Sequence, residues 1–498
     1  TAITIDSSEN VGIGNSAPLG KLTISNAAGA FAPSTVTAAN TYLQLGSDDY
    51  GLSNNGKFMI GFGFTDATNT NSPAYIGYEE ASTSGDTYGD LTFYTRSVTT
   101  DTAPTERFRI ASDGSLSTPT LGTSNVRFGV NAGNSIASGG TNNVFVGDEA
   151  GTANTTADHN TALGYGTLSS DTLGQANVAI GSQALATQNF TSSTDSYNTA
   201  VGRKAGYAVT TGTQNTLIGG LAGDAITTAS ATAVGYSSLT ALTTGGDNTA
   251  VGGRSLFSTT TGASNTAVGK DVMYYNTTGA SNVALGAGAL GSNTTASNNT
   301  AVGSSALTAN TTGANNVAVG YNSLVANTTG QLNVGVGRVA LNSNTTGASN
   351  VGVGNAALAS NTTADNNTAV GNSALSANTI GIDNVAIGSN ALASNTTASN
   401  NTAVGVNALD TNTTGANNTA VGKNALDANT TGVDNTAVGK SAGAAITTGV
   451  RNNCFGLEAA VNLTTGTDNT FIGKGCSPNV TTGSGNIAIG DISAIGNR

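Results

Sequence analysis

The chain has 498 residues, of which only 9% are charged, and its formal net charge is −12. That balance disfavours nucleic acid as a partner, because phosphate recognition depends on an excess of Lys and Arg. No apolar run approaches the roughly 20 residues that cross a bilayer as a helix, so membrane insertion is not expected. Two cysteines, Cys454 and Cys476, are too few for a disulfide scaffold or a CxxC metal site.

Residues 1 to 125 differ in pattern from the rest of the chain. Short runs of alternating apolar residues are separated by turn signals such as SDDYG and SNNGK, and no helix-period stretch appears. The runs expected to form strands read AITID, KLTIS, TYLQLG, KFMIGFGF, AYIGYEE, DLTFYT and ERFRIAS. We therefore predict a small all-β domain over residues 1–125.

Residues 126–498 are dominated by a seventeen-residue repeat. One copy, Asn299 to Asn315, reads NTAVGSSALTANTTGAN, and we number its residues as repeat positions 1 to 17. Position 4 is apolar and position 5 is Gly in all 22 copies, from Phe128 to Ile489. The spacing is irregular over residues 126–250 and regular over 251–490. A fixed period of this kind predicts stacked structural units and not a series of globular domains.

Each repeat combines strand and turn signals. Positions 1 to 5, NTAVG, place β-branched residues at alternating sites, which is typical of a strand. Positions 8 and 9, usually Ala-Leu, form a second apolar segment, and positions 12 to 15, NTTG, favour a turn. We therefore expect an all-β fold in which about 22 coils form a β-solenoid or β-roll. The expected repeat core, shown for two adjacent copies, is Val302, Gly303, Leu307, Val319, Gly320 and Leu324.

Positions 9 and 12 exchange large side chains. Position 9 is Leu or Met in 14 copies, and position 12 is then usually Asn. Four copies instead have Gly at position 9 and a β-branched residue at position 12: Gly133 with Ile136, Gly206 with Val209, Gly223 with Ile226, and Gly443 with Ile446. This pattern predicts that both positions reach one core space, which has to stay filled.

Position 5 and the two cysteines give further expectations. An invariant Gly at position 5 indicates a close backbone approach, a neighbouring chain, or a positive φ. Cys454 falls on position 3 and Cys476 on position 8, where most copies have Ala or Ser. We expect both cysteines to be buried as small hydrophobes.

One Val, one Leu and two small residues in each repeat supply little burial compared with the entropy of ordering seventeen residues. Packing several chains together would bury additional surface. A homotrimer is the obvious closed arrangement, and a monomeric solenoid remains the alternative.

Two stretches resemble known families. NTAVG followed by a small-residue segment resembles the head repeats of YadA-type trimeric adhesins, which are β-rolls wound as homotrimers. Residues Gly89 to Ser117 and Ile3 to Gly14 resemble segments of tailed-bacteriophage fibre proteins. Together the resemblances cover most of the chain. They imply a phage tail fibre shaft with a role in host-surface attachment, located in the virion or outside the cell.

The same resemblances imply the partners and leave alternatives. The expected partners are two further copies of the chain, a glycan or protein receptor on the host cell surface, and other virion tail proteins. A bacterial surface adhesin or an extracellular filament subunit is the alternative, and a polysaccharide-degrading tailspike is a third reading. Such fibres often carry a self-cleaving chaperone, which we expect to have followed Ile489 in a precursor.

No catalytic, cofactor-binding or metal site is expected. A nucleophilic triad would have to use His159, which lies in a turn and reads as an exposed residue. The adjacent acids Asp48 and Asp49, or Glu79 and Glu80, read as solvated pairs and not as a glycosidase pair. The chain contains neither a GGxGxD calcium repeat nor an EF-hand loop.

Aromatic residues at outward-facing positions are the candidates for surface binding. Tyr165, Tyr236 and Tyr321 occupy position 6, while Tyr207, Phe257 and Tyr274 occupy position 10. Exposed tyrosines can stack on sugar rings, although isolated ones are often incidental. An ice-binding surface is disfavoured, because the adjacent Thr side chains at positions 13 and 14 should diverge.

Overall fold

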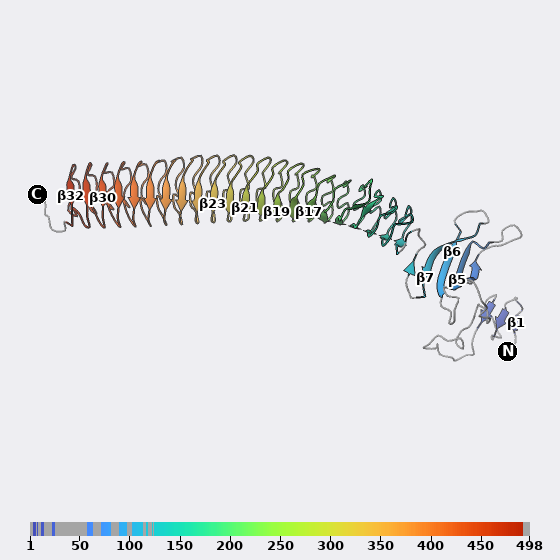
Figure 1. Cartoon of the computed structure of the whole chain (residues 1–498). Helices are drawn as coiled ribbons and strands as arrows, with labels where there is room; N and C mark the ends of the chain where they lie inside the picture. The colour runs from blue at the N-terminus through green and yellow to red at the C-terminus, as the bar shows by residue number, and fades with distance from the viewer. Residues whose placement is uncertain are drawn as a thin grey trace. The chain divides into compact units, whose positions relative to one another are not determined.

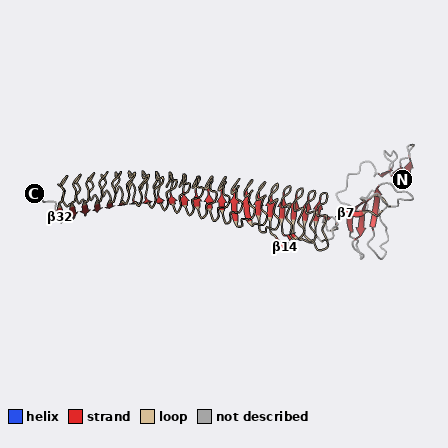
Figure 2. Cartoon of the chain, turned by 90° about the horizontal axis from the view of Figure 1, so that it is seen from above, coloured by secondary structure: helices blue, strands red, loops and turns tan. Residues whose placement is uncertain are grey.

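The computed structural model is all-β, as the sequence predicts, and divides into two compact units, Thr1–Pro119 and Thr120–Arg498. It describes residues 3–5, 7, 11–13, 22–24, 57–62, 71–80, 89–96, 102–112, 116–117, 122 and 124–491. Every regular element within these ranges is a strand (Figures 1 and 2).

The described residues of the first unit form two small sheets. The strands β1 (Ile3–Ile5), β2 (Val11–Ile13) and β3 (Leu22–Ile24) form one sheet, in which β2 pairs antiparallel with β1 and parallel with β3. The other is an antiparallel meander of β4 (Lys57–Phe62), β5 (Ala74–Glu80), β6 (Gly89–Thr95), β7 (Thr105–Ile110) and β8 (Leu116–Ser117). The strands β1, β3, β4, β5, β6 and β7 overlap predicted runs, β2 and β8 lie outside them, and TYLQLG lies outside the described residues.

The second unit is a β-solenoid in which each coil contributes one short strand to a continuous parallel sheet (Figure 1). Each strand pairs in register with the strand one coil before and one coil after it. These 22 strands are β9 (Val126–Phe128), β10 (Val144–Val146), β11 (Thr161–Leu163), β13 (Val178–Ile180), β15 (Thr199–Val201), β16 (Thr216–Ile218), β17 (Ala231–Val234), β18 (Asn248–Val251), β19 (Thr266–Val268), β20 (Val283–Leu285), β21 (Thr300–Val302), β22 (Val317–Val319), β23 (Val334–Val336), β24 (Val351–Val353), β25 (Thr368–Val370), β26 (Val385–Ile387), β27 (Thr402–Val404), β28 (Thr419–Val421), β29 (Thr436–Val438), β30 (Asn453–Phe455), β31 (Thr470–Ile472) and β32 (Ile487–Ile489).

One early coil carries an insertion. Residues 187–198, which lengthen the repeat at this point, contain β14 (Thr194–Asp195), which pairs in parallel with β12 (Gly174–Gln175). The insertion is anchored by the buried carboxylate of Asp171, which accepts a 2.7 Å hydrogen bond from Gln188.

Backbone hydrogen bonds join neighbouring coils around the whole circuit and not only along the strands. In one repeat, the Thr300 amide donates to Asn316, the Leu307 amide to Ser323, and the Thr311 amide to Thr328, all one coil ahead. Two asparagine files add side-chain bonds. At position 1, the backbone N–H of Asn316 donates to the Asn299 Oδ1 atom at 2.9 Å. At position 12, the Asn310 Nδ2 atom donates to the Asn293 Oδ1 atom at 3.1 Å.

The strand presents its small residue to the interior and its large residue to the outside. Ala301, at position 3, is fully buried, whereas Val302 and Val319, at position 4, are half-buried. Successive side chains of a strand point to opposite faces, so burial of position 3 forces positions 2 and 4 outward. The prediction that Val302 and Val319 belong to the coil core is therefore corrected. Leu307 and Leu324 are fully buried, as expected.

Gly at position 5 meets two of the three conditions that the sequence suggested, a positive φ and a close backbone approach. The backbone of Gly303 has a φ of 135°. A Cβ atom added there would lie 2.5 Å from the carbonyl oxygen of Gly320 in the next coil. The same close approach recurs along the array, which explains why this position is always Gly.

The exchange between positions 9 and 12 has a direct geometric cause. Leu307 adopts the left-handed region with a φ of 52°, an uncommon conformation for Leu. Gly443 occupies the same position with a φ of 56°, and a Cβ atom added to it would lie 2.9 Å from the Ile446 Cδ1 atom. Position 12 therefore fills the space that the position 9 side chain vacates, which confirms the prediction of a shared core space.

This exchange gives a prediction for Leu307 and Asn310. Replacing Leu307 with Gly should destabilise the coil by about 2–5 kcal/mol, because a buried cavity opens. Asn310→Ile alone should also destabilise it, because Ile competes with Leu307 for space and interrupts the asparagine file. The double variant Leu307→Gly/Asn310→Ile should recover stability, with a coupling of about 0.5–3 kcal/mol. Chemical denaturation followed by circular dichroism measures the three shifts; a double variant less stable than both single variants contradicts the mechanism.

A second prediction contrasts two glycines. Gly303→Ala should destabilise the solenoid by about 2–4 kcal/mol through backbone strain and overpacking. A Cβ atom added at Gly253, at position 6, would have no other atom within 4 Å, and Gly253 is not among the residues with positive φ. Gly253→Ala should therefore change stability by less than about 1 kcal/mol, in the stabilising direction. Equal thermal shifts for the two variants would refute this account.

Candidate functional site

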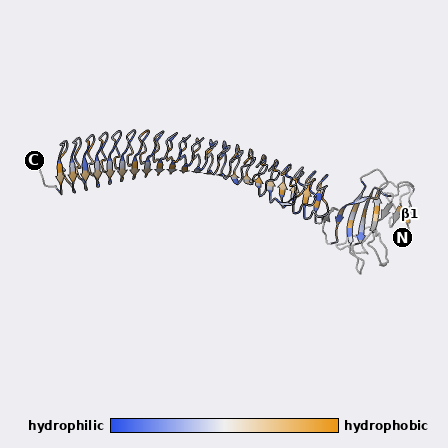
Figure 3. Ribbon diagram, turned by 45° about the horizontal axis from the view of Figure 1, so that its top comes forward, coloured by the Kyte–Doolittle hydropathy of each residue, from blue (hydrophilic) through white to orange (hydrophobic). Residues whose placement is uncertain are grey.

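The outward side chains at positions 2 and 4 form a surface that we call the outer strand face. Position 4 is Val, Ile, Leu or Phe in every one of the 22 strands, and none of these side chains is buried. Leu285 is 46% exposed and Val283, at position 2 of the same strand, is 43% exposed. Figure 3 shows hydrophobic colour recurring on the strands from coil to coil.

The apolar residues of this surface are contiguous, because position 4 is apolar in every coil. Scattered exposed apolar residues are normal, whereas a patch larger than a few hundred Å² marks an interaction site. At about 4.8 Å per strand and about 3.3 Å per residue, 22 three-residue strands make a ribbon of roughly 1,000 Å². Position 4 of this ribbon is apolar throughout, whereas position 2 is Thr or Asn in 13 copies and Val or Ile in nine. The outer strand face therefore combines a continuous apolar file with a mixed one.

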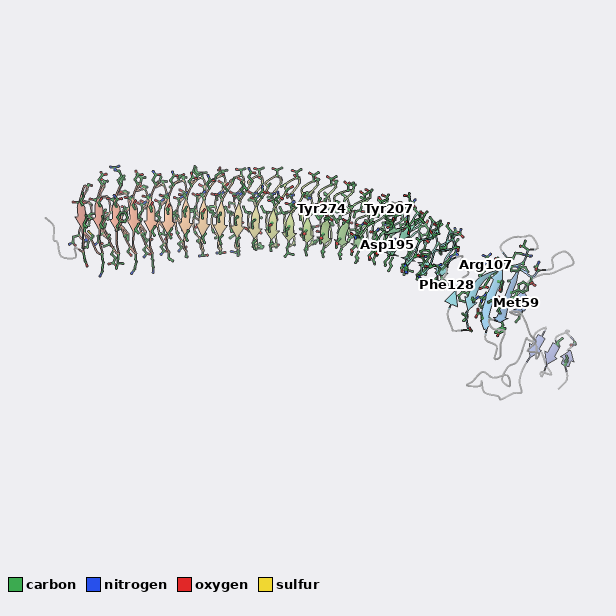
Figure 4. All side chains as sticks on the ribbon, viewed as in Figure 1. Met59, Arg107, Phe128, Asp195, Tyr207 and Tyr274 are labelled. Carbon is green, nitrogen blue, oxygen red and sulfur yellow. The ribbon has the colours of Figure 1, made fainter. Side chains whose placement is uncertain are left out.

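The predicted aromatic residues do not form one site. Tyr165, Tyr236 and Tyr321 are exposed on separate coils. Tyr207 is half-buried, and the Lys204 Nζ atom lies 5.0 Å from its ring centroid. Figure 4 labels Tyr207 and Tyr274 at different points along the solenoid.

Phe257 and Tyr274, in contrast, come together at position 10 of consecutive coils. Their ring centroids are 4.9 Å apart and their planes differ by 2°. Tyr275 meets Tyr274 edge to face at 4.7 Å. The Arg254 guanidinium lies 5.5 Å from the Tyr274 centroid and forms an ion pair of 2.8 Å with Asp271.

We call these five residues the aromatic cluster, and sequence reasoning missed three of them. Tyr275, Arg254 and Asp271 were not predicted as site residues. The available signal was that position 10 is aromatic in two consecutive copies, since equal positions of neighbouring coils lie about 4.8 Å apart. Aromatic residues therefore do concentrate in one place on the solenoid.

The candidate catalytic groups are not assembled into a reactive arrangement. His159 is exposed in a turn with a φ of 59°, and its Nε2 atom lies 3.5 Å from Asn142. Glu79 and Glu80 belong to a strand and not to a loop. The Glu79 carboxylate pairs with Arg109 at 2.7 Å. Asp48 and Asp49 lie outside the described residues.

One sheet of the first unit carries a charged network around Arg109. The guanidinium pairs with Glu79 and Glu106 at 2.7 Å each, and also with the buried carboxylate of Asp90. The hydrogen bond to Glu106 is the main reason that the pKa of Arg109 lies above its usual value. Arg109 thereby ties three adjacent strands together, which is a structural role.

The cysteines are buried, as predicted. Burial, with a smaller contribution from Cys476, raises the pKa of Cys454 to about 12. A thiol needs a lowered pKa to act as a nucleophile near neutral pH, so the Cys454 thiol is expected to be unreactive.

Within the described ranges, no group of three or more His, Cys, Asp or Glu residues could hold a metal ion. In the same ranges there is no helix long and apolar enough to cross a membrane. No protein-family model, curated protein or solved structure matches the chain. The resemblance to phage fibres therefore stays a prediction, and the fold itself defines the protein as a β-solenoid repeat protein.

Stacked acids give a prediction for pH dependence. Asp410 and Asp427 occupy position 10 of neighbouring coils. Burial raises the pKa of both carboxyls, and the Asp427 charge raises that of Asp410 further. A raised pKa in the folded state means that the protonated form stabilises the fold. This contribution is complete below the unfolded pKa of about 3.9 and is lost as the pH rises through the folded value.

Asp410→Asn should therefore raise the thermal midpoint at neutral pH, and the gain should shrink at about pH 3. The matched control is Asp383→Asn, because its neighbours at position 17 are Asn366 and Asn400 and not carboxylates. Thermal melts of both variants at the two pH values provide the comparison. A gain at Asp410 that is independent of pH would contradict the assigned cause.

Proposed function

We propose that this chain is a structural and adhesive fibre segment that acts as a homotrimer. The observation that supports this proposal is the outer strand face, whose position 4 is apolar in every coil. The other outward positions of the solenoid are mostly Ser, Asn, Thr, Ala and charged residues. In the proposed assembly, three parallel chains turn this face toward a common axis. Each chain then buries a face that would otherwise meet water.

The dimensions support an obligate assembly. A ribbon of roughly 1,000 Å² per chain exceeds the roughly 800 Å² that each partner contributes to a standard stable interface. A parallel arrangement keeps the register, because every chain repeats at the same coil spacing. One narrow file at position 4, next to Gly at position 5, suits a threefold axis on which three such files meet.

The biological role that we favour is a phage tail fibre shaft with a part in host-surface attachment, in the virion and outside the cell. Its partners would be a glycan or protein receptor on the host surface and other virion tail proteins. A trimer presents each surface site three times, so that weak contacts gain avidity. A bacterial adhesin or extracellular filament subunit would use the same trimer, while a polysaccharide-degrading tailspike would require cleavage activity in the purified chain.

The trimer proposal predicts the solution mass and its response to charge. Light scattering of the intact protein should give three times the 48.6 kDa chain mass. Val302→Asp together with Val370→Asp should dissociate the trimer, because each level would bring three carboxylates together in an apolar interface. The control carries Ser304→Asp and Asn372→Asp, which add the same charge to the same coils at position 6, and should stay trimeric.

A mass near that of one chain for the unmodified protein would defeat the homotrimer. Dissociation of both double variants alike would show that charge, and not the outer strand face, governs assembly. Circular dichroism of each variant checks that the coils remain folded.

A further inference from the structure

We propose that the aromatic cluster of Arg254, Phe257, Asp271, Tyr274 and Tyr275 binds the pyranose rings of an oligosaccharide. The proposal rests on the attachment role given above and names its chemistry. The cluster lies on side chains at positions 7, 10 and 11, which are separate from the outer strand face at positions 2 and 4. Trimer formation through that face would leave the cluster accessible.

The rings form a preorganised platform. Phe257 and Tyr274 are stacked in parallel, so each holds the other in a fixed orientation. Tyr275 contacts Tyr274 edge to face and is 58% exposed, which leaves ring surface open to a ligand. A rigid aromatic surface suits a sugar, because the C–H groups on one face of a pyranose pack against a ring while its hydroxyls remain at the rim.

The next coil has no side chain at the two positions that carry the cluster. Positions 7 and 10 there are Gly288 and Gly291, so no side chain continues either file. A Cβ atom at Gly288 would have no atom within 4 Å, whereas one at Gly291 would lie 3.1 Å from the Gly288 carbonyl oxygen. One coil further, the Thr308 hydroxyl donates a 2.9 Å hydrogen bond to the same carbonyl oxygen. The aromatic file at position 10 therefore ends at Tyr274.

Polar groups border the platform. The Arg254 guanidinium contacts Asp271 through two N–O distances of 2.8 Å, which fixes both side chains beside Tyr274. A guanidinium has five N–H donors, and this pairing uses only part of them. The phenolic hydroxyls of Tyr274 and Tyr275 add groups that both donate and accept. Small-molecule sites typically combine such an apolar surface with a few placed polar groups.

Other ligands fit less well. Single-stranded nucleic acid also stacks on aromatic rings, but it needs a basic groove, and this chain has a net charge of −12. A protein partner needs a large contact area, whereas position 11 on either side of Tyr275 contributes only the small residues Ser258 and Ser292. A sugar needs only the platform and its polar border.

The solenoid contains its own control. Tyr321 is exposed at position 6, and within the described part of the chain its ring makes no contact with another ring. Replacement of Tyr321 removes an exposed phenol without affecting any platform.

The test is isothermal titration calorimetry of the intact protein with four probes, the hexasaccharides of α-1,4-glucose, β-1,4-glucose, β-1,4-mannose and β-1,4-N-acetylglucosamine. At least one should bind at concentrations up to about 10 mM. Tyr275→Ala should weaken that binding by at least about tenfold, or about 1.4 kcal/mol, while Tyr321→Ala should stay within about twofold. Gly288→Asn, which introduces a residue that the repeat uses at position 7 in Asn322 and Asn390, should place a side chain in the gap after Arg254 and Asp271 and also weaken binding.

Two results would overturn the proposal: no heat of binding for any of the four probes, or equal losses for Tyr275→Ala and Tyr321→Ala. Tyr275 is exposed and Asn is already tolerated at position 7, so these variants keep the fold, and circular dichroism verifies it. The outcome is separable from the trimer test. A monomer that binds a hexasaccharide through Tyr275 would contradict the homotrimeric fibre and leave the oligosaccharide site intact. A trimer that binds none of the four probes would contradict only the oligosaccharide site.

Discussion

The structure depends on hydrogen bonding between successive coils in strict register. Backbone amides at positions 2, 9 and 13 donate hydrogen bonds one coil ahead, and those at positions 5, 7 and 17 donate one coil back. The asparagine side chains at positions 1 and 12 also form hydrogen bonds with the equivalent asparagine of the neighbouring coil. A buried amide or carbonyl group without a partner is destabilising, so each coil requires its neighbours to have the same shape. Coils of the same shape need the same number of residues, which is why the sequence repeats every seventeen residues.

That register leaves a narrow interior and explains what fills it. Coils that approach closely at position 5 allow only Gly there, because a Cβ atom at Gly303 would lie 2.5 Å from the backbone of the next coil. The interior then accommodates Ala at position 3 opposite Leu at position 9, with asparagine files completing the section. Larger groups enter only where another is removed, so Phe145 lies against Gly151, and Ile446 lies against Gly443. The volume of the core is maintained although its residues differ.

Much of this could be predicted, because repetition displays which residues vary together. The period, the solenoid, the glycine requirement and the exchange of positions 9 and 12 all follow from comparing copies within one chain. The direction of Val302 did not follow, because alternation fixes which side chains share a face but not which face is inside. Val302 was assigned to the interior, although Ala301 is the residue of this strand that faces it. The aromatic cluster was missed because its members were assessed one copy at a time.

The two kinds of surface follow from the same stacking. A position that is apolar in every copy becomes a continuous file, which is how Val302 and its equivalents create an apolar surface from one residue per coil. A position that varies becomes a place where local chemistry can change without disturbing the ladder, because its side chain lies outside the core. Two aromatic residues seventeen apart in the sequence then stack at 4.9 Å, as Phe257 and Tyr274 do. Binding groups therefore need to arise only at equal positions of adjacent copies, and the scaffold itself supplies their geometry.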